Sequence, residues 1–482
     1  MYSVVTPAQM RQLEQEAFRE GVSGLLLMEN AAHALVDELV NMLGAAKGKT
    51  VCFFCGSGNN GGDGLAAARL FHLRGGKAYI CLSGEVSTPD AITNLRYAQA
   101  LKLPIVERPM DLPLPDAAVD ALFGTGLDRA PEGKPAELID IINLLKVPVL
   151  SADVPSGLDA QTGIPYGHCV CADRTLTFQY PKLGLLLTQT PEYVGELIVR
   201  DIGLPLDLLQ EPRLTALEAV ELNGRLPKRS RAAHKGSNGR VLIFAGSMGM
   251  AGAAAMAAQG CLRSGAGLVT FVCQEDIIPI LQMLVPGAQC RSIRKVLENV
   301  PAHDVFLAGC GLGQEASAWD AFDRLYDPAL PSVLDADALN LLAKNPRVLG
   351  EKTIITPHVG EAGRLLSWPL HAVTASMLEA AYALHNKFGC VVALKSHCSV
   401  ITDGARTALN TVGSPSLAKG GSGDALAGIM AGLLAQKTDP YEAARTACLW
   451  LGKAGQMAED KFGTQSALTI DILSLLGEAA MG

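Results

Sequence analysis

The chain has 482 residues, of which 49% are hydrophobic and 18% are charged, and its formal net charge is −8. This composition belongs to a globular protein with room for two or three domains, and it excludes an intrinsically disordered chain. The negative charge argues against nucleic acid as the main partner, because nucleic-acid-binding proteins present a basic surface.

The N-terminal segment predicts a helix, and no targeting signal is expected. Thr6 suits the N-cap, Pro7 the first helical position and Gln9 the third position of a capping box. The segment lacks the apolar core of a signal peptide, and no stretch approaches the ~20 uninterrupted apolar residues of a membrane span. Twelve scattered cysteines are typical of thiols in a reducing compartment. We therefore expect a cytoplasmic protein that has no membrane partner.

Short apolar runs alternate with amphipathic stretches through the first part of the chain. This alternation predicts a parallel sheet with helices on both faces. Cys52 and Cys55 lie three residues apart in the first expected strand, so they face opposite sides of the sheet, and a metal or redox pair is not expected. We expect strands at 50–55, 77–82, 117–123 and 147–152, with helices such as 65–73 and 136–145 between them.

A glycine-rich turn, "GSGNNGGDG", follows the first expected strand. Backbone N–H groups at such a turn approach an anion closely, and the following helix adds partial positive charge. The GxGxxG spelling is that of dinucleotide-binding turns, but Asn59, Asn60 and Asp63 form a polar cluster that a dehydrogenase does not need there. Oxygen atoms at this turn suit a cation or a polar ring, although the asparagines could also simply support left-handed turn geometry.

Two further polar loops follow expected strands. The first carries Asp120 and then Gly124-Thr125-Gly126, and the second carries Asp153 and Ser156. Since ligands bind beyond the carboxyl ends of parallel strands, we expect the three loops to line one site. Asp153 directly follows an apolar run, which would partly bury its carboxylate and suit it to proton transfer. Asp120 could equally be a loop cap.

The three loops "GSGNNGGDG", "DALFGTGL" and "DVPSGLDA" together resemble the epimerase domain of the NAD(P)H-hydrate repair enzymes, over about residues 8–205. The resemblance implies a Rossmann-like, three-layer fold, with Asp153 as the proton-transfer residue. It also implies a potassium ion held by Asn60, Asp120 and Ser156. Lys182 is a weaker candidate, because an isolated lysine is usually exposed. The implied contacts of the hydrated nucleotide are Asn59, Asn60, Gly61, Gly62, Asp63, Gly124, Thr125, Gly126, Leu127, Asp128, Arg129, Ala130 and Asp153.

The alternating pattern stops in a Pro- and Leu-rich stretch around 201–226, and we place a domain boundary at residue 212. The first domain is then 1–212 and the second 213–482. A second α/β series follows the boundary, and by periodicity the last ~60 residues are mostly helical. The strands expected in this series are 240–245, 267–272, 304–308, 332–335, 353–356 and 390–395.

The stretch "AKGGSGDALAGIMAGLLAQ" is the most informative part of the second domain. Gly420, Gly421 and Gly423 lead into a helix expected over 425–434, and Asp424 lies at its start. Backbone N–H groups at this position stabilise a transferring phosphoryl group, and a carboxylate there accepts a proton from an attacking hydroxyl. The alternative is a plain helix cap by an aspartate after a flexible loop.

This turn resembles the ribokinase-like superfamily. The further motifs "AGCGLG", "VLDADALNLL", "TPHVGEAGRLL" and "VALKSHCSVITDG" narrow the resemblance to the dehydratase domain of the same repair enzymes, over about residues 225–480. It implies that Asp424 is catalytic and that Ala253, Gly313, His358 and Asp424 contact the hydrated nucleotide. The implied phosphodonor contacts are Lys395, Ser396, His397, Cys398, Ser399 and Gly423.

Some residues of the second domain keep two interpretations. The phosphodonor loop lacks the glycines usual in the family, which restricts close backbone approach. A lone histidine such as His358 is more often structural than functional. Asp335 and Asp337, at the end of an expected strand, could support the site or touch the ligand.

The two resemblances imply a metabolite-repair enzyme. It would interconvert the R and S forms of hydrated NADH and NADPH, and dehydrate the S form at the expense of ADP, with magnesium. ADP is expected because bacterial relatives generally use it, and a homo-oligomer is implied by the family. The alternatives are a small-molecule kinase fused to a nucleotide-binding module and, behind it, a dehydrogenase.

Overall fold

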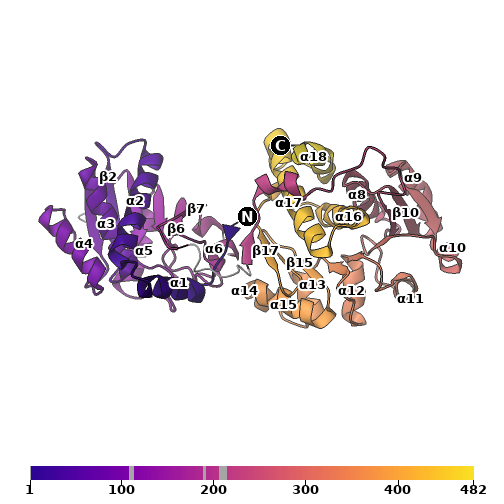
Figure 1. The fold of residues 1–482 in the computed structure, drawn as a ribbon, viewed down its shortest axis with the longest axis horizontal. Helices are drawn as coiled ribbons and strands as arrows, with labels where there is room; N and C mark the ends of the chain where they lie inside the picture. Colours follow the sequence, from indigo (N-terminus) through magenta and orange to yellow (C-terminus); the bar gives the residue numbers. More distant parts are fainter. Residues whose placement is uncertain (1, 108–112, 188–190, 206–213, 482) are drawn as a thin grey trace. The chain divides into compact units, whose positions relative to one another are not determined.

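The computed structural model describes residues 2–107, 113–187, 191–205 and 214–481. The chain divides into two compact units, each with its own sheet and core (Figure 1). The N-terminal unit is Ser3–Pro212, and the C-terminal unit is Arg213–Gly482 together with Met1–Tyr2.

The N-terminal unit is built on a six-stranded sheet in the order β3-β2-β4-β5-β6-β7, and all of its pairings are parallel. Its strands are β2 (Thr50–Cys55), β3 (Lys77–Leu82), β4 (Ala117–Ala121), β5 (Val149–Ala152), β6 (Arg174–Phe178) and β7 (Glu196–Arg200). The expected parallel sheet is confirmed, and β4 and β5 are shorter than expected. The last two strands were not predicted, because β6 carries no long apolar run and β7 is a half-exposed edge strand.

Helices cover both faces of this sheet, as the alternating pattern predicted. Val51, Phe53 and Cys55 of β2 pack with α1 to α4, whereas Cys52 and Phe54 pack with α5. The opposite orientation of the two cysteines is thereby confirmed, and all twelve cysteines of the chain are free. The helices are α1 (Pro7–Arg19), α2 (Gly24–Leu43), α3 (Asn59–Leu73), α4 (Pro89–Ala100), α5 (Lys134–Leu144) and α6 (Leu183–Leu187).

The predicted capping box fixes the start of α1. Thr6 Oγ1 accepts a hydrogen bond from the Gln9 backbone N–H at 3.1 Å, and Gln9 Oε1 accepts one from the Thr6 N–H at 2.8 Å. The start of α3 differs from the prediction, because the helix begins at Asn59 and not at Leu65. Several glycines of the glycine-rich turn therefore lie inside the helix and pack it closely against the sheet.

The C-terminal unit has an eleven-stranded sheet in the order β1-β8-β17-β16-β15-β14-β13-β12-β9-β10-β11. Pairing is parallel from β11 to β15, and β16 is antiparallel to both of its neighbours. The six predicted strands are present as β9 (Arg240–Phe244), β10 (Leu268–Cys273), β12 (Val305–Ala308), β13 (Ser332–Leu334), β14 (Thr353–Ile355) and β15 (Val391–Leu394). Those not predicted are short and lie toward the edges: β1 (Tyr2–Ser3), β8 (Leu214–Ala216), β11 (Gln289–Ser292), β16 (Ser399–Thr402) and β17 (Thr407–Asn410).

The last part of the chain is helical as expected, and α16 is buried along most of its length. An added Cβ at Gly428 would lie 1.9 Å from the Ala257 carbonyl oxygen, so glycine is required where α16 crosses α8. Figure 1 shows α16 and α17 in yellow on one face of the sheet and α12, α13 and α15 in orange on the other. The helices are α7 (Leu222–Arg225), α8 (Ala251–Arg263), α9 (Ile278–Leu284), α10 (Ile293–Glu298), α11 (Ala316–Leu325), α12 (Asp337–Lys344), α13 (Val359–Leu366), α14 (Leu370–Ala375), α15 (Met377–Phe388), α16 (Ser422–Ala435), α17 (Pro440–Phe462) and α18 (Thr469–Met481).

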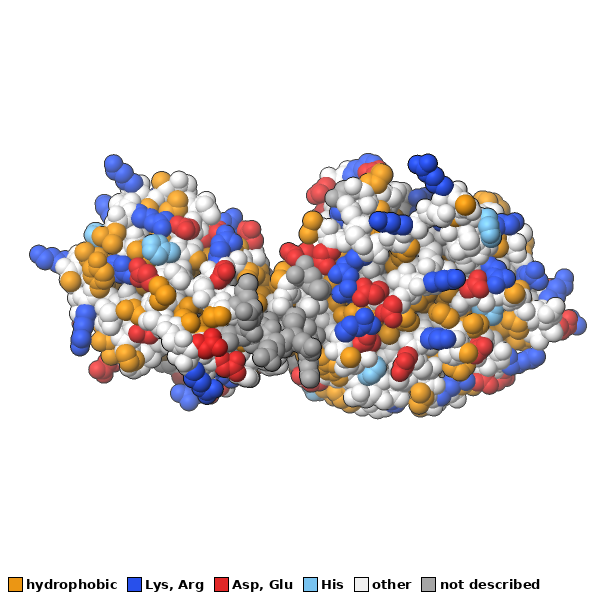
Figure 2. Space-filling view, in the orientation of Figure 1, with side chains coloured by type: hydrophobic (Ala, Val, Ile, Leu, Met, Phe, Trp, Pro, Cys, Tyr) orange, Lys and Arg blue, Asp and Glu red, His pale blue; other side chains and the backbone are white. Residues whose placement is uncertain are grey.

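Among the described helices, none combines the length and the apolar character needed to cross a bilayer. Figure 2 shows acidic and basic side chains interspersed over the visible surface of each unit. The visible described surface thus presents no continuous basic area of the kind that nucleic-acid-binding proteins use.

Candidate active sites

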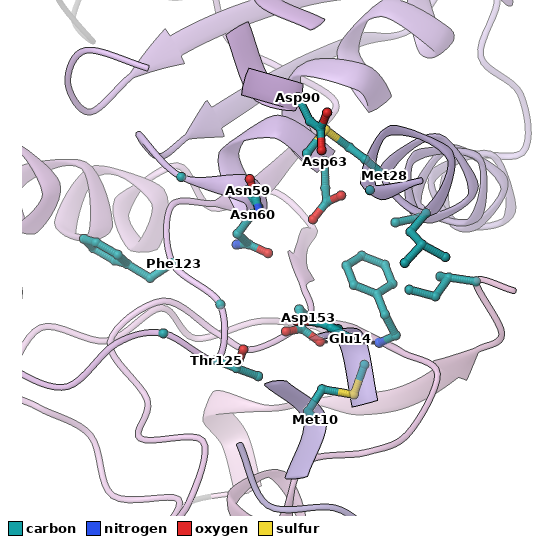
Figure 3. Close-up of a pocket in the computed structure, with 18 of the residues that line it drawn as sticks. Met10, Glu14, Met28, Asn59, Asn60, Asp63, Asp90, Phe123, Thr125 and Asp153 are labelled. Carbon is teal, nitrogen blue, oxygen red and sulfur yellow. Dashed lines mark hydrogen bonds between the residues drawn. The ribbon is translucent and has the colours of Figure 1, made fainter. Parts of the chain in front are cut away.

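A cavity of about 470 Å³ lies at the carboxyl end of the sheet in the N-terminal unit. It is placed where β2 is flanked by β3 on one side and β4 on the other, the position at which parallel α/β sheets bind ligands. The loops after β2, β4 and β5 all contribute to its wall, as expected (Figure 3). The predicted residues that line the cavity are Asn59, Asn60, Asp63, Gly124, Thr125, Gly126, Leu127 and Asp153.

Other predicted ligand contacts lie outside the cavity wall. Gly61 and Gly62 are buried in the first turn of α3, where an added Cβ would lie 2.0 Å from the Gly56 carbonyl oxygen and 2.5 Å from Met28 Cε respectively. These two glycines allow the helix to pack. Residues 128–130 continue the loop after Leu127 as an exposed segment.

Asp153 and Lys182 form a buried ion pair at one side of the cavity. Asp153 directly follows β5, with a backbone φ of +66°, and its Oδ1 accepts hydrogen bonds from Lys182 Nζ and from Thr177 Oγ1 at 3.1 Å. Its second oxygen lies on the cavity side, since an added Cβ at Gly124 would be 3.3 Å from Oδ2. Lys182 is only 1% exposed and also donates to the Phe178 carbonyl at 3.0 Å. The weaker candidate Lys182 thus does line the cavity, and the alternative of an exposed surface lysine does not hold.

Two more carboxyl groups share this cavity. Figure 3 shows Asp63 and Asp153 directed into the same space, with Glu14 beside Asp153. Burial, together with the charges of Asp153 and Glu14, raises the pKa of Asp63 well above its ordinary value. Burial and the charge of Asp153 also raise the pKa of Glu14. Sequence reasoning missed Glu14, although it follows the buried Met10 by four residues on α1.

Of the three residues predicted to hold potassium, Asp120 and Ser156 lie in a group of oxygen atoms behind the cavity wall, and Asn60 lines the cavity itself. The buried Asp120 carboxylate accepts hydrogen bonds from Ser156 Oγ, from the Ser156 N–H at 2.8 Å and from Ser151 Oγ at 2.9 Å. Ser156 Oγ lies 3.3 Å from the Phe123 carbonyl oxygen. Among the described residues, no partner is present for the buried Nδ2 of Asn60. One carboxylate with hydroxyl and carbonyl oxygens fits a monovalent cation.

Burial is the main electrostatic influence on Asp120. It raises the pKa of this carboxyl, and the hydrogen bonds from Ser156 and Ser151 act in the opposite direction. Asp120 also accepts a hydrogen bond from the Leu122 N–H at 3.2 Å, as a loop cap does. Its two interpretations are thus compatible, because the same carboxylate caps the loop and faces the oxygen group.

The candidate site of the C-terminal unit lies where parallel strands end at the start of α16. Lys395 follows β15, and its Nζ donates a hydrogen bond to Asp335 Oδ1 at 2.7 Å. An added Cβ at Gly423 would lie 3.2 Å from the same Nζ, so the ammonium sits beside the first turn of α16. Burial lowers the pKa of Lys395, but Asp335 and Glu361 outweigh it and raise the value overall. The helix start and the ammonium, which is paired with Asp335, are the positive groups described at this site.

Asp424, in the first turn of α16, is surrounded by three other polar groups. Its carboxylate, that of Asp335 and the sulfur of Cys310 have atoms that all lie within 4.8 Å of one another. Burial and the charge of Asp335 raise the pKa of Asp424, while a hydrogen bond from Cys310 and the charge of Lys395 lower it. Asp424 is thus a partly accessible carboxylate beside an ammonium. A general base in a phosphoryl-transfer site has similar surroundings.

His358 caps α13 and also faces the charged groups of this site. Its Nδ1 accepts hydrogen bonds from the N–H groups of Gly360 at 2.9 Å and Glu361 at 3.4 Å. The exposed fraction of its side chain is 55%, and burial of the rest lowers its pKa, as does Lys395. Burial raises the pKa of Glu361 to about 7. The structural interpretation of His358 is thus correct, and its exposed edge leaves room for a ligand.

The remaining predicted residues surround this centre. Ala253 lies in the first turn of α8, and Gly313 donates its N–H to Asp337 Oδ2 at 2.9 Å. Asp335 and Asp337 thus both support neighbouring groups by hydrogen bonds. In the loop predicted to bind the phosphodonor, Cys398 is buried, and burial raises its thiol pKa to about 12. This side chain therefore points into the unit, and Ser399 begins β16.

Comparison with known families divides the chain in the same two parts. A family model described as NAD(P)H-hydrate dehydratase matches residues 241–476, and one described as YjeF-related protein N-terminus matches residues 24–184. The bifunctional NAD(P)H-hydrate repair enzyme Nnr of Moorella thermoacetica is 36% identical over 98% of this chain and 96% of its own length. The enzyme of the same name from Coxiella burnetii is 37% identical over 96% of both chains.

Solved structures resemble the C-terminal part. The ADP/ATP-dependent NAD(P)H-hydrate dehydratase of Bacillus subtilis, co-crystallised with ATP and Mg²⁺, has a TM-score of 0.51 and 29% identity, over 55% of this chain and 97% of that one. A ribokinase-like superfamily protein of Enterococcus faecalis has a TM-score of 0.51 and 27% identity, over 57% of this chain and 99% of that one.

Proposed function

This chain belongs to the family of bifunctional NAD(P)H-hydrate repair enzymes, and we propose that each of its two units carries one of the two activities. The domain 1–212 interconverts the R and S forms of hydrated NADH and NADPH. The domain 213–482 removes water from the S form at the expense of ADP. Together they return both epimers of a damaged nucleotide to NADH or NADPH.

The placement of Asp424 is the observation that carries the dehydratase assignment. This carboxylate lies at the start of α16, where backbone N–H groups and the Lys395 ammonium favour a phosphoryl group. Asp424 accepts the proton of the substrate hydroxyl as the oxygen attacks the terminal phosphorus of ADP and AMP leaves. Ala253, Gly313 and His358 surround this position and hold the hydrated nucleotide.

The new phosphate ester makes departure of the oxygen possible, because hydroxide itself is a poor leaving group. The lone pair of the ring nitrogen expels phosphate, and the adjacent ring carbon then loses a proton, which restores the dihydronicotinamide. ADP enters as its magnesium complex. Its proposed contacts are Lys395, Ser396, His397, Cys398, Ser399 and Gly423. The position of Lys395 Nζ beside Gly423 supports this proposal, and the buried Cys398 could contribute only backbone atoms.

In the N-terminal unit, Asp153 is proposed to move the proton that epimerisation requires. The hydrated carbon bears both a hydroxyl and the ring nitrogen, so the ring opens when the hydroxyl proton passes to that nitrogen as the C–N bond breaks. The ring then recloses on either face. Lys182 holds Oδ1 of Asp153, which leaves Oδ2 directed toward the cavity for proton exchange.

Asn60, Asp120 and Ser156 are proposed to hold a potassium ion, with the Phe123 carbonyl as a further oxygen ligand. A potassium ion there supplies positive charge to a buried carboxylate and ties together two loops of the cavity wall. Epimerisation by wild type should slow a few-fold when potassium is replaced by tetramethylammonium. The Asp120→Asn variant should epimerise at the same rate in both salts. Equal rates in both salts would remove the ion from the account.

We also propose a cytoplasmic homo-oligomer. The free state of all twelve cysteines supports a reducing compartment. Light scattering of the purified full chain tests the oligomeric state, and a monomer at micromolar concentration would contradict it. Cell fractionation tests the compartment.

The overall function is tested by incubating the full chain with a mixture of R- and S-hydrated NADH and MgADP. Recovery of the dihydronicotinamide absorbance for both epimers is expected, and it should require ADP. A stable phosphorylated product without recovered absorbance would instead identify a small-molecule kinase. Hydride transfer from intact NADH would identify a dehydrogenase.

A further inference from the structure

We propose that Cys310 is a positioning residue of the dehydration reaction: its buried thiol lies within 4.8 Å of the Asp424 carboxylate and orients it by donating a hydrogen bond. The inference rests on the proposed function, in which Asp424 accepts the substrate proton. Cys310 belongs to the sequence "AGCGLG". Gly313 of this motif was a predicted ligand contact, whereas no role was predicted for Cys310.

The backbone around Cys310 is held in one conformation. Gly309 has a φ of +119° and Gly311 a φ of +62°, and an added Cβ at Gly309 would lie 1.8 Å from the Asp335 carbonyl oxygen. The Cys310 carbonyl accepts a hydrogen bond from the Gly246 N–H at 2.9 Å. A side chain is thus excluded at Gly309 and strained at Gly311, which leaves Cys310 as the residue of this turn that can present a functional group to the site.

The thiol is placed to donate rather than to react. Cys310 is fully buried, with its sulfur within 4.8 Å of carboxylate atoms of both Asp424 and Asp335. Burial and the two negative charges raise its pKa well above the ordinary value, so the sulfur keeps its proton. Asp335 Oδ1 already accepts a hydrogen bond from Lys395 at 2.7 Å, so the proposed acceptor of the thiol proton is the carboxylate of Asp424.

Two other uses of this cysteine fit the surroundings less well. A divalent metal bound by Cys310, Asp335 and Asp424 would lie beside the ammonium of Lys395, whose positive charge is paired with Asp335 and would repel it. The second use is a purely apolar one, which Cys390 illustrates. Cys390 is a buried cysteine of the same unit, and burial alone raises its thiol pKa. Cys310 differs from Cys390 in facing two carboxylates, one of which is the proposed base.

The expected consequence concerns the pH at which Asp424 becomes a carboxylate. The groups that face it are Asp335 after β13, Lys395 after β15 and Cys310 after β12, with Glu361 and His358 next to Lys395 at the start of α13. Asp335 favours protonation of Asp424, whereas Cys310 and Lys395 oppose it. Loss of the thiol hydrogen bond therefore moves the acid limb of the dehydration profile to higher pH.

The test measures kcat/KM for ADP-dependent dehydration against pH in the full chain, using wild type, Cys310→Ala, Cys310→Ser and the control Cys390→Ala. Cys310→Ala should move the acid limb up by about one pH unit, a roughly tenfold loss on that limb, with little change in KM for ADP. Cys310→Ser should restore most of the loss, because its hydroxyl also donates. Cys390→Ala should follow the wild-type profile.

An unchanged acid limb in Cys310→Ala would overturn the inference, as would equal losses in the Ala and Ser variants. If Cys310→Ala does not fold, Cys310→Val replaces it, because valine fills the space of the thiol and has no hydrogen-bond donor. The results expected for Cys310→Ala then apply to Cys310→Val. Failure of the proposed function is distinguishable: wild type would then show no ADP-dependent dehydration, or Asp424→Asn would retain it. The role of Cys310 alone would be rejected if wild type is active, Asp424→Asn is inactive and the acid limb of Cys310→Ala matches that of wild type.

Discussion

The two candidate sites place carboxylates in different surroundings. In the N-terminal unit, Asp153 pairs with Lys182 and shares its cavity with Glu14 and Asp63, so this site is rich in groups that exchange protons. In the C-terminal unit, Asp424 lies at a helix start beside an ammonium, where a phosphoryl group is stabilised. The difference matches the two proposed reactions, because phosphoryl transfer needs positive charge around the moving phosphate and proton transfer alone does not.

The largest expected effect separates the two sites in one protein. Asp424→Asn should lower the rate of ADP-dependent dehydration about a thousandfold, because an amide cannot accept the hydroxyl proton. Epimerisation, measured on the same preparation by chromatography of the R and S forms, should be unchanged and serves as the internal control. Equal loss of both activities would show that the substitution disturbs more than the C-terminal site.

The reciprocal substitution should affect only the other activity. Asp153→Asn is expected to slow epimerisation about a hundredfold while the pure S form is dehydrated at the wild-type rate. A mixture of epimers should then show fast recovery of absorbance from the S fraction and slow recovery from the rest. Monophasic recovery identical to wild type would remove Asp153 from the mechanism.

The buried ion pair offers a test of stability as well as activity. Lys182→Met leaves the Asp153 carboxylate without its ammonium partner and should destabilise the N-terminal unit by about 3 kcal/mol. The measurement is calorimetric unfolding of the full chain, with Lys47→Met as an exposed-lysine control. All three tryptophans, Trp319, Trp368 and Trp450, lie in the C-terminal unit, so the fluorescence-detected transition should not move. An unshifted calorimetric transition would contradict the assigned pair.

A smaller effect concerns pH and the C-terminal unit. Burial raises the pKa of Glu361 from 4.5 to about 7, so the folded chain holds a proton there that the unfolded chain has lost. This contribution to stability is complete below pH ~4.5 and is lost as the pH rises through about 7. In Glu361→Gln, the fall of the unfolding free energy across this window should be smaller by about 2 kcal/mol.

Tryptophan fluorescence in urea reports this pH dependence for the C-terminal unit alone. His358, whose pKa is lowered by burial, contributes a slope of the opposite sign. Because its ring lies 3.4 Å from Glu361, the comparison is repeated in a His358→Gln background. Parallel pH profiles for wild type and Glu361→Gln would show that the carboxyl titrates at its ordinary value.

The central strands and the loops of both sites could be predicted from the sequence. Continuous apolar runs such as 50–55 specify strands that are buried on both faces, and polar residues directly after them must lie at one edge of a parallel sheet. Asn60 and Asp153 were predicted in this way, whereas Asp424 was predicted from the glycine-rich turn at the start of an apolar helix. The edge strand β7 was missed because it is half-exposed, and β17 was missed because its four residues, TALN, begin and end with polar side chains.

The missing parts of the sites depend on packing between distant segments. Lys182 was only a weak candidate, since nothing in "YPKLGLL" shows that the lysine is buried and that its ammonium pairs with Asp153. Glu14 reaches the cavity only because α1 packs against it. Likewise the contact of Cys310 with Asp424 joins residues more than a hundred positions apart, which no local pattern encodes.

The most direct measurement follows phosphate during a single turnover. The full chain is mixed with S-hydrated NADH and ADP labelled on its terminal phosphate, and NADH, AMP and labelled phosphate are quantified over time. One AMP and one labelled phosphate are expected for each NADH formed by wild type, and none of the three should form with Asp424→Asn. NADH formation without ADP consumption, or at the wild-type rate in Asp424→Asn, would contradict the account.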